Sequence, residues 1–270
     1  MHEKLKETTT YLRNVGVVAP QTGIVLGTGL GSLVNEIEII TSVDYASIPH
    51  FPLSTVESHE GRLIYGTLAN KTVLVMQGRF HYYEGYRFLD ITFPVRVMKA
   101  LGVSQLLLSN AAGSMTPELP KGSLMLIDDH INFLPGNPLR GVNDPKMGDR
   151  FPDMSRPYSP EINALFKQVA AELSISLKEG IYLAVMGPNL ETRAEYRMFR
   201  TFANAVGMST VPEVIVANQI KLPCAAVSVL TDECDPDHLK PVDIADILKT
   251  AAEAEPHLTR LFKEVVARLP

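Results

Sequence analysis

The stretch that decides the fold is Gly187–Glu213, which reads GPNLETRAEYRMFRTFANAVGMSTVPE. The apolar run 182–186 just before it is typical of a buried strand that ends in a turn. We expect a helix to follow, with Asn189 as its N-cap, because apolar residues then recur at three- and four-residue spacing. These residues are Ala194, Met198, Phe199 and Phe202. The expected helix places Glu191 in its first turn.

Two polar side chains in this stretch each allow two interpretations. The helix dipole alone favours an acid in the first turn, so Glu191 is either a charge-compensated helix start or a ligand-binding carboxylate. A second apolar run ends at Val206-Gly207, and residues 210–213 open another helix. Ser209 therefore lies at a strand-to-helix corner, where hydroxyls and backbone N–H groups bind anions. It is either an anion ligand or a plain helix cap.

The composition favours one α/β domain over residues 1–270. The chain has 270 residues, 46% of them hydrophobic, and no Ser/Gly-rich linker or run of charge divides it. Its net charge of −5 provides no broad basic field. We therefore expect no nucleic-acid partner, and any anion site must be local.

The cysteines and the N-terminal residues indicate which cellular compartment we expect for the protein. Cys224 and Cys234 form neither a Cys-x-x-Cys pair nor a metal-ligand cluster, which indicates a reducing, cytoplasmic compartment. Residues 1–7 lack the apolar centre of a signal peptide, and no apolar run approaches the ~20 residues of a membrane span. The histidines have no metal-ligand spacing. We expect neither a membrane partner nor a metal.

A glycine-rich segment, Gly27–Ser32, follows a predicted buried strand at 23–26 and precedes a helix expected from Leu33. Glycines there let backbone amides approach a phosphate closely, and Thr28 adds a hydroxyl. Ser32 stands where a dinucleotide-binding loop has its third glycine, and no clear acid follows at the expected distance. The segment therefore favours a single phosphate over a pyrophosphate, with an ordinary strand-to-helix turn as the alternative.

Basic side chains gather at the ends of a predicted hairpin, whose strands are 62–65 and 72–76. His59 precedes the first strand, while Arg79 and His81 follow the second and project to one side of an extended chain. A guanidinium binds phosphate oxygens bidentately, and an adjacent imidazole donates a further bond. In a chain that is otherwise acidic, these groups favour an oxyanion site.

Two further predicted strands end in residues suited to a ligand. The buried strand 105–109 ends in Asn110–Gly113, whose small residues leave room for a flat molecule or form a tight turn. The strand 223–230 ends just before Asp232, at the position where open α/β sheets place ligand groups.

A long loop separates the two halves of the chain. It follows a predicted strand at 124–127 and the segment 128–132, is rich in Pro, Gly and Asn, and runs to Pro160. A loop of this length is usually functional or an oligomer contact, and Phe151 is its most exposed-looking aromatic residue. Helices are expected at 88–101 and at 242–268.

A series of motifs recurs in a familiar order along the chain. They are Gly27-Thr-Gly-Leu-Gly, Gln77-Gly-Arg-Phe-His-Tyr-Tyr-Glu-Gly-Tyr86, Asn110-Ala-Ala-Gly, His130-Ile-Asn, Asn137-Pro-Leu-Arg-Gly, Gly148-Asp-Arg-Phe-Pro, Gly187-Pro-Asn-Leu-Glu-Thr and Gly207-Met-Ser-Thr-Val-Pro-Glu. Together they cover nearly the whole chain, and they resemble the motifs of the trimeric purine nucleoside phosphorylases.

This resemblance implies a fold, an activity and an assembly. The fold would be a one-domain α/β structure around a mixed, partly barrel-like sheet flanked by helices. The activity would be a pentosyltransferase of purine salvage, the reversible phosphorolysis of purine ribonucleosides, inosine and guanosine above all, to free base and ribose 1-phosphate. The partners would be the nucleoside and inorganic phosphate as co-substrate, with no cofactor. The chain would form a homotrimer with its active site near a subunit boundary.

The resemblance also carries residue roles onto matching positions. Phosphate would be held by Thr28, His59, Arg79, His81, Ala111 through its backbone, and Ser209. The ribose would meet Tyr83, Met208 and, from the neighbouring subunit, Phe151. The base would meet Ala112, Gly113, Leu190, Glu191, Val206 and Asp232. The catalytic side chains would be Glu191, Asp232 and His81.

Three departures from the family's pattern bear on the substrate. Asp232 stands where the 6-oxopurine enzymes usually carry asparagine, and an ionised carboxylate accepts from a 6-amino group. Leu190 replaces an aromatic residue of the base pocket. The histidine expected at the 5′-hydroxyl has no clear match, and His238 is a weak substitute.

Alternatives to the main expectation follow from these departures and from the glycine-rich segment. A methylthioadenosine phosphorylase, or a phosphorylase that also accepts adenosine, shares the chemistry. A nucleoside-binding protein without catalytic activity would share only the nucleoside-binding site with these enzymes. A dinucleotide-dependent oxidoreductase is disfavoured by the broken glycine fingerprint.

Overall fold

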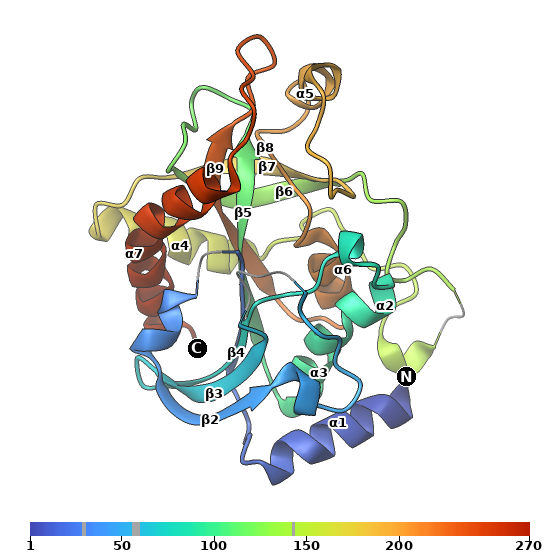
Figure 1. Cartoon of the computed structure of the whole chain (residues 1–270). Coiled ribbons are helices and arrows are strands. Elements are labelled where there is room, and N and C mark those ends of the chain that lie inside the picture. The colour runs from blue at the N-terminus through green and yellow to red at the C-terminus, as the bar shows by residue number, and fades with distance from the viewer. Residues whose placement is uncertain (29–30, 56–59, 142–143) are drawn as a thin grey trace.

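The strands form one mixed sheet through the molecule. A computed structural model describes residues 1–28, 31–55, 60–141 and 144–270, and Figure 1 shows its course. The strands are β1 (Thr22–Leu26), β2 (Glu38–Asp44), β3 (Arg62–Leu68), β4 (Lys71–Gln77), β5 (Gln105–Ser114), β6 (Leu124–Asn132), β7 (Leu177–Ala184), β8 (Ala205–Gly207) and β9 (Cys224–Glu233). Their order in the sheet is β2-β3-β4-β1-β5-β8-β7-β6-β9.

Part of this sheet closes on itself. Strand β9 also pairs with β5, in parallel, so that β5, β8, β7, β6 and β9 form a closed ring. The remaining strands β1 to β4 extend from β5 as an open wing, joined through the parallel β1–β5 pair. The expected α/β fold with a mixed, partly barrel-like sheet is confirmed.

Helices cover both faces of the sheet. They are α1 (His2–Asn14), α2 (Phe88–Ile91), α3 (Phe93–Leu101), α4 (Pro160–Glu172), α5 (Arg193–Phe199), α6 (Val211–Gln219) and α7 (Ile244–Arg268), with short 3-10 turns η1 (Ser32–Glu36), η2 (Tyr45–Ser47), η3 (Tyr82–Glu84) and η4 (Pro145–Met147). Figure 1 shows α4 and α7 on one side and α1, α3 and α6 on the other. None of the helices in the described ranges is long and apolar enough to cross a membrane.

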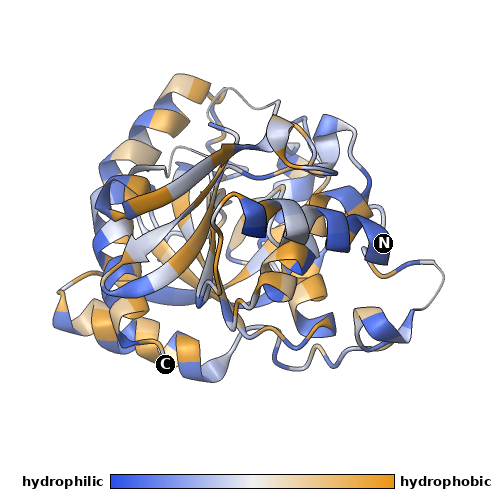
Figure 2. Ribbon diagram, turned by 90° about the horizontal axis from the view of Figure 1, so that it is seen from below, coloured by the Kyte–Doolittle hydropathy of each residue, from blue (hydrophilic) through white to orange (hydrophobic). Residues whose placement is uncertain are grey.

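The hydrophobic core has two parts, one on each face of the sheet, because successive side chains of a strand point to opposite faces. In β4, Leu74 and Met76 join the cluster under α1, α3 and α6, whereas Val73 and Val75 join the cluster under α4 and α7. Successive side chains of a strand point to opposite faces, so a strand covered on both sides reads as a continuous apolar run. Orange, hydrophobic segments are frequent in the strands at the centre of Figure 2.

The helix expected after Gly187 begins later than predicted. Its N-cap is Thr192, whose hydroxyl accepts from the N–H of Glu195 while the Glu195 carboxylate accepts from the N–H of Thr192. This reciprocal capping box satisfies two backbone donors, so it outcompetes Asn189 as a helix start. Glu191 therefore precedes the helix, and the charge-compensation interpretation is wrong.

The buried face of that helix also differs from the expected one. Tyr196 and Phe199 face the core, whereas Met198 and Phe202 are exposed. The predicted face was therefore correct for Phe199 and wrong for Met198 and Phe202, and it missed Tyr196. The helix is only seven residues long, too short for periodicity to decide its orientation.

Three further boundaries were predicted wrongly. The segment Asn110–Gly113 continues β5 instead of ending it, because it pairs with β9 as far as Ser114. The helix expected from Leu33 is the 3-10 turn η1 followed by β2, which pairs with β3. The helix expected at 88–101 is interrupted at Thr92, two residues before Pro94, which has no N–H to donate.

Candidate active site

One cavity of about 390 Å³ gathers nearly all the predicted site residues. Its lining includes Thr28, Arg79, His81, Tyr83, Ala111, Ala112, Gly113, Leu190, Glu191, Val206, Met208, Ser209 and Asp232. Two predicted residues are not among them. His59 lies outside the described residues, and Phe151 is 89% exposed on the long loop, away from this lining.

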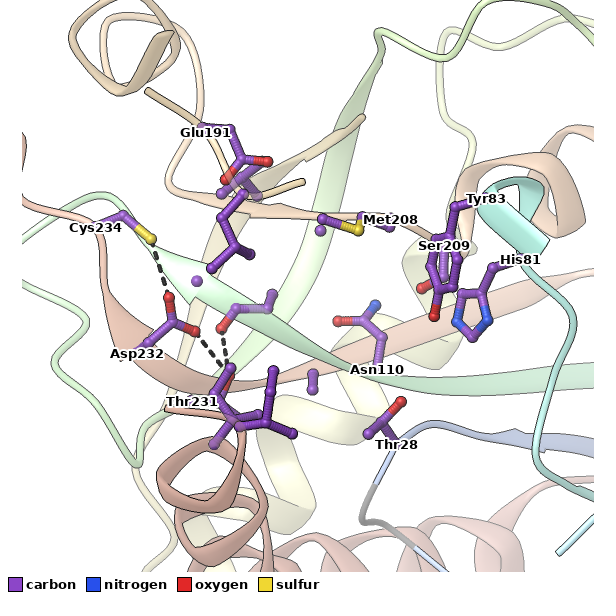
Figure 3. A pocket seen from close by; sticks show the side chains of 18 of the residues that line it. Thr28, His81, Tyr83, Asn110, Glu191, Met208, Ser209, Thr231, Asp232 and Cys234 are labelled. Carbon is purple, nitrogen blue, oxygen red and sulfur yellow. Dashed lines mark hydrogen bonds between the residues drawn. The ribbon is translucent and has the colours of Figure 1, made fainter. Parts of the chain in front are cut away.

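The cavity has two chemically different ends (Figure 3). Thr28, His81 and Ser209 lie at one end, and Glu191 and Asp232 lie at the other. Strand β5 passes beneath both ends. Its small residues Ala111, Ala112 and Gly113 line the cavity. An anion and a group with hydrogen-bond donors can therefore occupy one cavity at opposite ends.

Arg79 is the buried cation of the first end. Its Nε donates to Glu213 Oε1 at 3.1 Å, and its Nη1 donates to the carbonyl oxygen of Ser109 at 2.5 Å. Nη1 also lies 3.5 Å from Ser209 Oγ. The guanidinium is thus oriented by α6 and β5 toward the hydroxyl at the β8–α6 corner. A planar guanidinium held in this way is suited to bind an oxyanion.

Ser209 is presented by a tight turn. Thr210 has φ +65° and ψ −50°, and the N–H of Val211 donates to the carbonyl oxygen of Ser209 at 2.7 Å, as in a γ-turn with positive φ. This conformation is rare and strained for a β-branched residue. The Asn110 amide holds it by donating to Thr210 Oγ1 at 2.8 Å. Backbone strain of this kind is commonly found at functional sites.

His81 is oriented by Glu84. The Glu84 carboxylate accepts from the His81 backbone N–H at 2.7 Å and contacts the ring Nδ1 at 2.9 Å. Burial alone raises the pKa of Glu84, but hydrogen bonds from His81 and Thr55 lower it to about 2. Glu84 is therefore ionised at neutral pH, and Nδ1 carries a proton toward it. Nε2 is then the ring nitrogen directed away from Glu84.

Tyr83 stacks on the His81 ring, with centroids 4.8 Å apart and planes 15° apart. Burial, followed by the Glu84 charge, raises the pKa of Tyr83 to about 12. Its phenol is therefore neutral and able to donate or accept one hydrogen bond. Such a group is suited to a sugar hydroxyl beside the anion.

Two carboxylates mark the opposite end. Burial raises the pKa of Glu191, and the charges of Asp232 and Glu195 act in the same direction. Asp232 accepts from Thr231 Oγ1 at 2.9 Å and from Cys234 Sγ at 3.3 Å. A register shift between Ala112 and Gly113 in the β5–β9 ladder sets Asp232 directly opposite Gly113. Any Cβ at Gly113 would overlap Cys234 Sγ, so glycine is required for this approach.

Several lining residues were not predicted as site residues from the sequence. They are Asn110, Tyr196, Gly207, Thr231, Cys234, Ile244, Ile247 and Leu248. Cys234 follows Asp232 by two positions, so period-two alternation could have found it. The residues of α7 reach the cavity only through tertiary packing, and no local signal marks them. His238 is exposed and paired with Asp235, and it does not line the cavity.

Metal binding finds no support within the described ranges. No three His, Cys, Asp or Glu side chains gather there in a way that could hold a metal ion.

Comparisons with known proteins agree with this geometry. The family model of the phosphorylase superfamily matches residues 21–267. Purine nucleoside phosphorylase 1 of Geobacillus stearothermophilus is 46% identical, over 98% of this chain and 97% of its own. The purine nucleoside phosphorylase of Bos taurus is 41% identical, over 100% of this chain and 96% of its own.

Solved structures resemble the whole chain equally closely. Isoform 2 of the Schistosoma mansoni purine nucleoside phosphorylase, in complex with cytosine and ribose-1-phosphate, has a TM-score of 0.94 and 38% identity, covering 99% of this chain and 97% of its own. The Schistosoma mansoni enzyme in complex with adenosine has a TM-score of 0.94 and 36% identity, covering 99% and 98%. The chain therefore belongs to the purine nucleoside phosphorylases of the phosphorylase superfamily.

Proposed function

We propose that the chain catalyses the reversible phosphorolysis of purine ribonucleosides to free base and ribose 1-phosphate. The observation that carries this proposal is the single cavity with an oxyanion end at Arg79 and Ser209 and a two-carboxylate end at Glu191 and Asp232. Phosphate fits the first end and a purine edge fits the second. The sugar would lie between them, beside Tyr83 and Met208.

The mechanism follows from this placement. A phosphate oxygen attacks the anomeric carbon, the glycosidic C–N bond breaks, and its electron pair passes to the purine ring. Arg79, His81, Ser209, Thr28 and the backbone of Ala111 would hold the phosphate, whose charge also stabilises the cationic sugar of the transition state. Glu191 and Asp232 would bind the ring nitrogens and the 6-substituent of the departing purine. Positioning and electrostatics would supply the rate, with inorganic phosphate as co-substrate and no cofactor.

The assembly we propose is a homotrimer in which Phe151 enters the ribose pocket of a neighbouring subunit. Its side chain is 89% exposed in the single chain, which is unusual for an aromatic residue of this size. Leu190, at the cavity, is also 43% exposed. A neighbouring subunit that covers the mouth of the cavity would bury both. The two free cysteines fit the reducing compartment of the cytoplasm.

A second candidate function is phosphorolysis of adenosine or methylthioadenosine. Asp232 accepts two hydrogen bonds, from Thr231 and Cys234. An ionised carboxylate accepts from a 6-amino group, whereas a 6-oxo group requires a donor. The apolar residues Ile247 and Leu248 also line the cavity, which suits an apolar 5′ substituent.

A nucleoside panel tests both candidates. Purified protein is incubated with inosine, guanosine, adenosine or methylthioadenosine, with and without inorganic phosphate, and free base and ribose 1-phosphate are quantified. We expect base release that requires phosphate and matches ribose 1-phosphate mole for mole. Binding of nucleosides without phosphate-dependent release would identify a nucleoside-binding protein instead. The preferred substrate distinguishes the first candidate from the second.

A further inference from the structure

The serine that interrupts the glycine fingerprint is bound to the last helix of the chain. Ser32 stands where a dinucleotide-binding loop has its third glycine, at the start of η1. Its backbone N–H donates to Glu255 Oε1 at 2.5 Å, and its hydroxyl donates to Glu255 Oε2 at 2.6 Å. A glycine could make only the first of these bonds. The serine therefore adds a contact between η1 and α7, which lie against each other in Figure 1.

Glu255 is a buried acid that the phosphorolysis mechanism does not use. It belongs to α7 and is 8% exposed. Among the described residues, Ser32 supplies both of the hydrogen bonds that its carboxylate accepts. Burial of a carboxylate costs free energy, and an apolar residue in such a place is often as stabilising or more so. Stability alone therefore does not explain an acid at this position.

The opposite end of the glycine-rich segment is attached to β5. The N–H of Gly27 donates to Ser109 Oγ at 3.2 Å. A Cβ at Gly27 would lie 2.7 Å from Asn110 Cα, so only glycine allows the backbone to approach β5 this closely. The segment is thus held by β5 at its first residue and by α7 at its last.

Thr28 lies between these two attachments. It lines the main cavity, and Figure 3 shows it at the same end as His81 and Ser209. A second cavity, of about 320 Å³, is lined by Gly27, Ser32 and Glu255, among others. Groups that border a void lack packing partners on one side. Hydrogen bonds at the two ends of the segment, rather than close packing, therefore set its position.

We propose that Glu255 is a positioning residue for phosphate: its two bonds to Ser32 hold the glycine-rich segment so that Thr28 faces the bound anion. The inference rests on the proposed function, which gives Thr28 a phosphate oxygen as its ligand. A side chain that contacts a ligand is precise only when its own surroundings fix it. A displacement of about 1 Å in such a site can cost ~10²-fold in rate.

The effect should be specific to phosphate, because α7 does not depend on Glu255 for its place on the sheet. The helix also lines the main cavity, through Ile247 and Leu248. Its position is set by a row of buried apolar side chains that belong to the core on that face of the sheet. They include Ala251, Ala254, Leu258, Leu261 and Phe262. Loss of the Glu255 carboxylate should therefore release Ser32 without moving the helix or the nucleoside that it contacts.

Glu255→Ala tests the proposal through the two Michaelis constants. We expect the KM for phosphate to rise about tenfold, the usual weight of a hydrogen bond to a charged group, and the KM for the nucleoside to change by less than about twofold. Glu255→Gln keeps an acceptor for the Ser32 N–H and should return the phosphate KM to within about threefold of the wild type. Glu253→Ala, an exposed acid on the same helix, is the matched control and should leave both constants unchanged.

A double-mutant cycle shows whether Glu255 acts through Thr28. Thr28→Ala alone should raise the KM for phosphate. In the Thr28→Ala background, Glu255→Ala should add less than about twofold, because the side chain that it positions is already missing. Ser32→Ala removes one of the two bonds at an exposed residue and should raise the phosphate KM about threefold. This variant decides the proposal if Glu255→Ala does not fold.

Several results would overturn the proposal while phosphorolysis stays established. They are an unchanged phosphate KM in folded Glu255→Ala or, failing that variant, in Ser32→Ala, equal rises in both Michaelis constants, or additive effects in the cycle. If the wild type released no base, the proposed function itself would fail. The rise in Tm that inorganic phosphate produces would then test the positioning role, since it should be smaller in Glu255→Ala than in the wild type. An equal rise in both proteins would reject it.

Discussion

Arg79 Nε lies 3.1 Å from Glu213 Oε1, and both side chains are almost completely buried, at 2% and 5% exposed. The pair connects the first strand hairpin to α6 and sets the guanidinium facing the Ser209 hydroxyl. A buried ion pair is costly to break, because removal of one partner leaves the other charge uncompensated.

Glu213→Gln should therefore lower the free energy of unfolding by roughly 3 kcal/mol. Inorganic phosphate should raise Tm more in this variant than in the wild type, because the bound anion replaces part of the missing negative charge. Thermal unfolding with and without phosphate measures both effects. Glu179→Gln, in the exposed pair with Lys167, is the control and should cost no more than about 1 kcal/mol. Equal stability of Glu213→Gln and wild type would contradict the expectation.

Stability should depend on pH through Glu84. Its pKa falls from 4.5 to about 2 on folding, so ionised Glu84 stabilises the native state at any pH above about 4.5. This contribution is lost as the pH falls toward about 2. The difference in unfolding free energy between wild type and Glu84→Gln should reach about 3 kcal/mol near neutrality and vanish near pH 2. Denaturant titrations across pH check this, with Glu253→Gln, an exposed acid on α7, expected to follow the wild type.

Substitutions of Glu191 and Glu195 should have separate effects, the first on catalysis and the second on helix capping. Glu191→Ala should reduce kcat/KM for phosphorolysis by ~10²–10³ while leaving Tm close to the wild type, because this carboxylate precedes the helix and faces the cavity. Glu195→Ala removes the capping-box acid and should cost about 1 kcal/mol of stability with activity retained. Activity of Glu191→Ala within a few-fold of the wild type would remove it from the catalytic set.

Subunit mixing tests the role of Phe151. In the proposed homotrimer, the Phe151→Ala and Glu191→Ala variants should each be weakly active. Co-refolded mixtures should recover activity, because some sites then combine an intact Glu191 with an intact Phe151 from a neighbour. Size-exclusion chromatography with light scattering establishes the oligomer first. A mixture no more active than the mean of its parents would mean that Phe151 serves only its own chain or none.

Much of the site was predictable because its residues stand at the ends of strongly apolar runs. Ser209 follows β8, Asp232 stands near the end of β9, and Arg79 follows β4, and such runs identify buried strands whatever their partners. The parallel and antiparallel pairing then brings those ends together. Local pattern was sufficient for these residues.

Local sequence pattern gave wrong predictions where two short-range signals competed. It also missed residues that reach the site only through contacts with segments distant in the sequence. Asn189 and Thr192 both suit a helix start, and only the reciprocal bond with Glu195 decides between them. Strand β2 was missed because its burial pattern is mostly exposed, so its apolar residues carry no clear alternation. Ile244, Ile247 and Leu248 of α7 line the cavity because this helix packs against β9. The residue spacing within 244–268 does not predict that packing.

Strand β5 sets the distance between the two ends of the cavity. The carbonyl oxygen of Ser109 holds Arg79, and Gly113, four residues along the same strand, faces Asp232. At about 3.3 Å per residue, the backbone sets these two anchors ~13 Å apart along the strand. Strand β5 pairs with β1, β8 and β9. An insertion between Ser109 and Gly113 would therefore shift the pairing of the rest of the strand. It would separate attacking oxygen from leaving group even with every functional side chain intact.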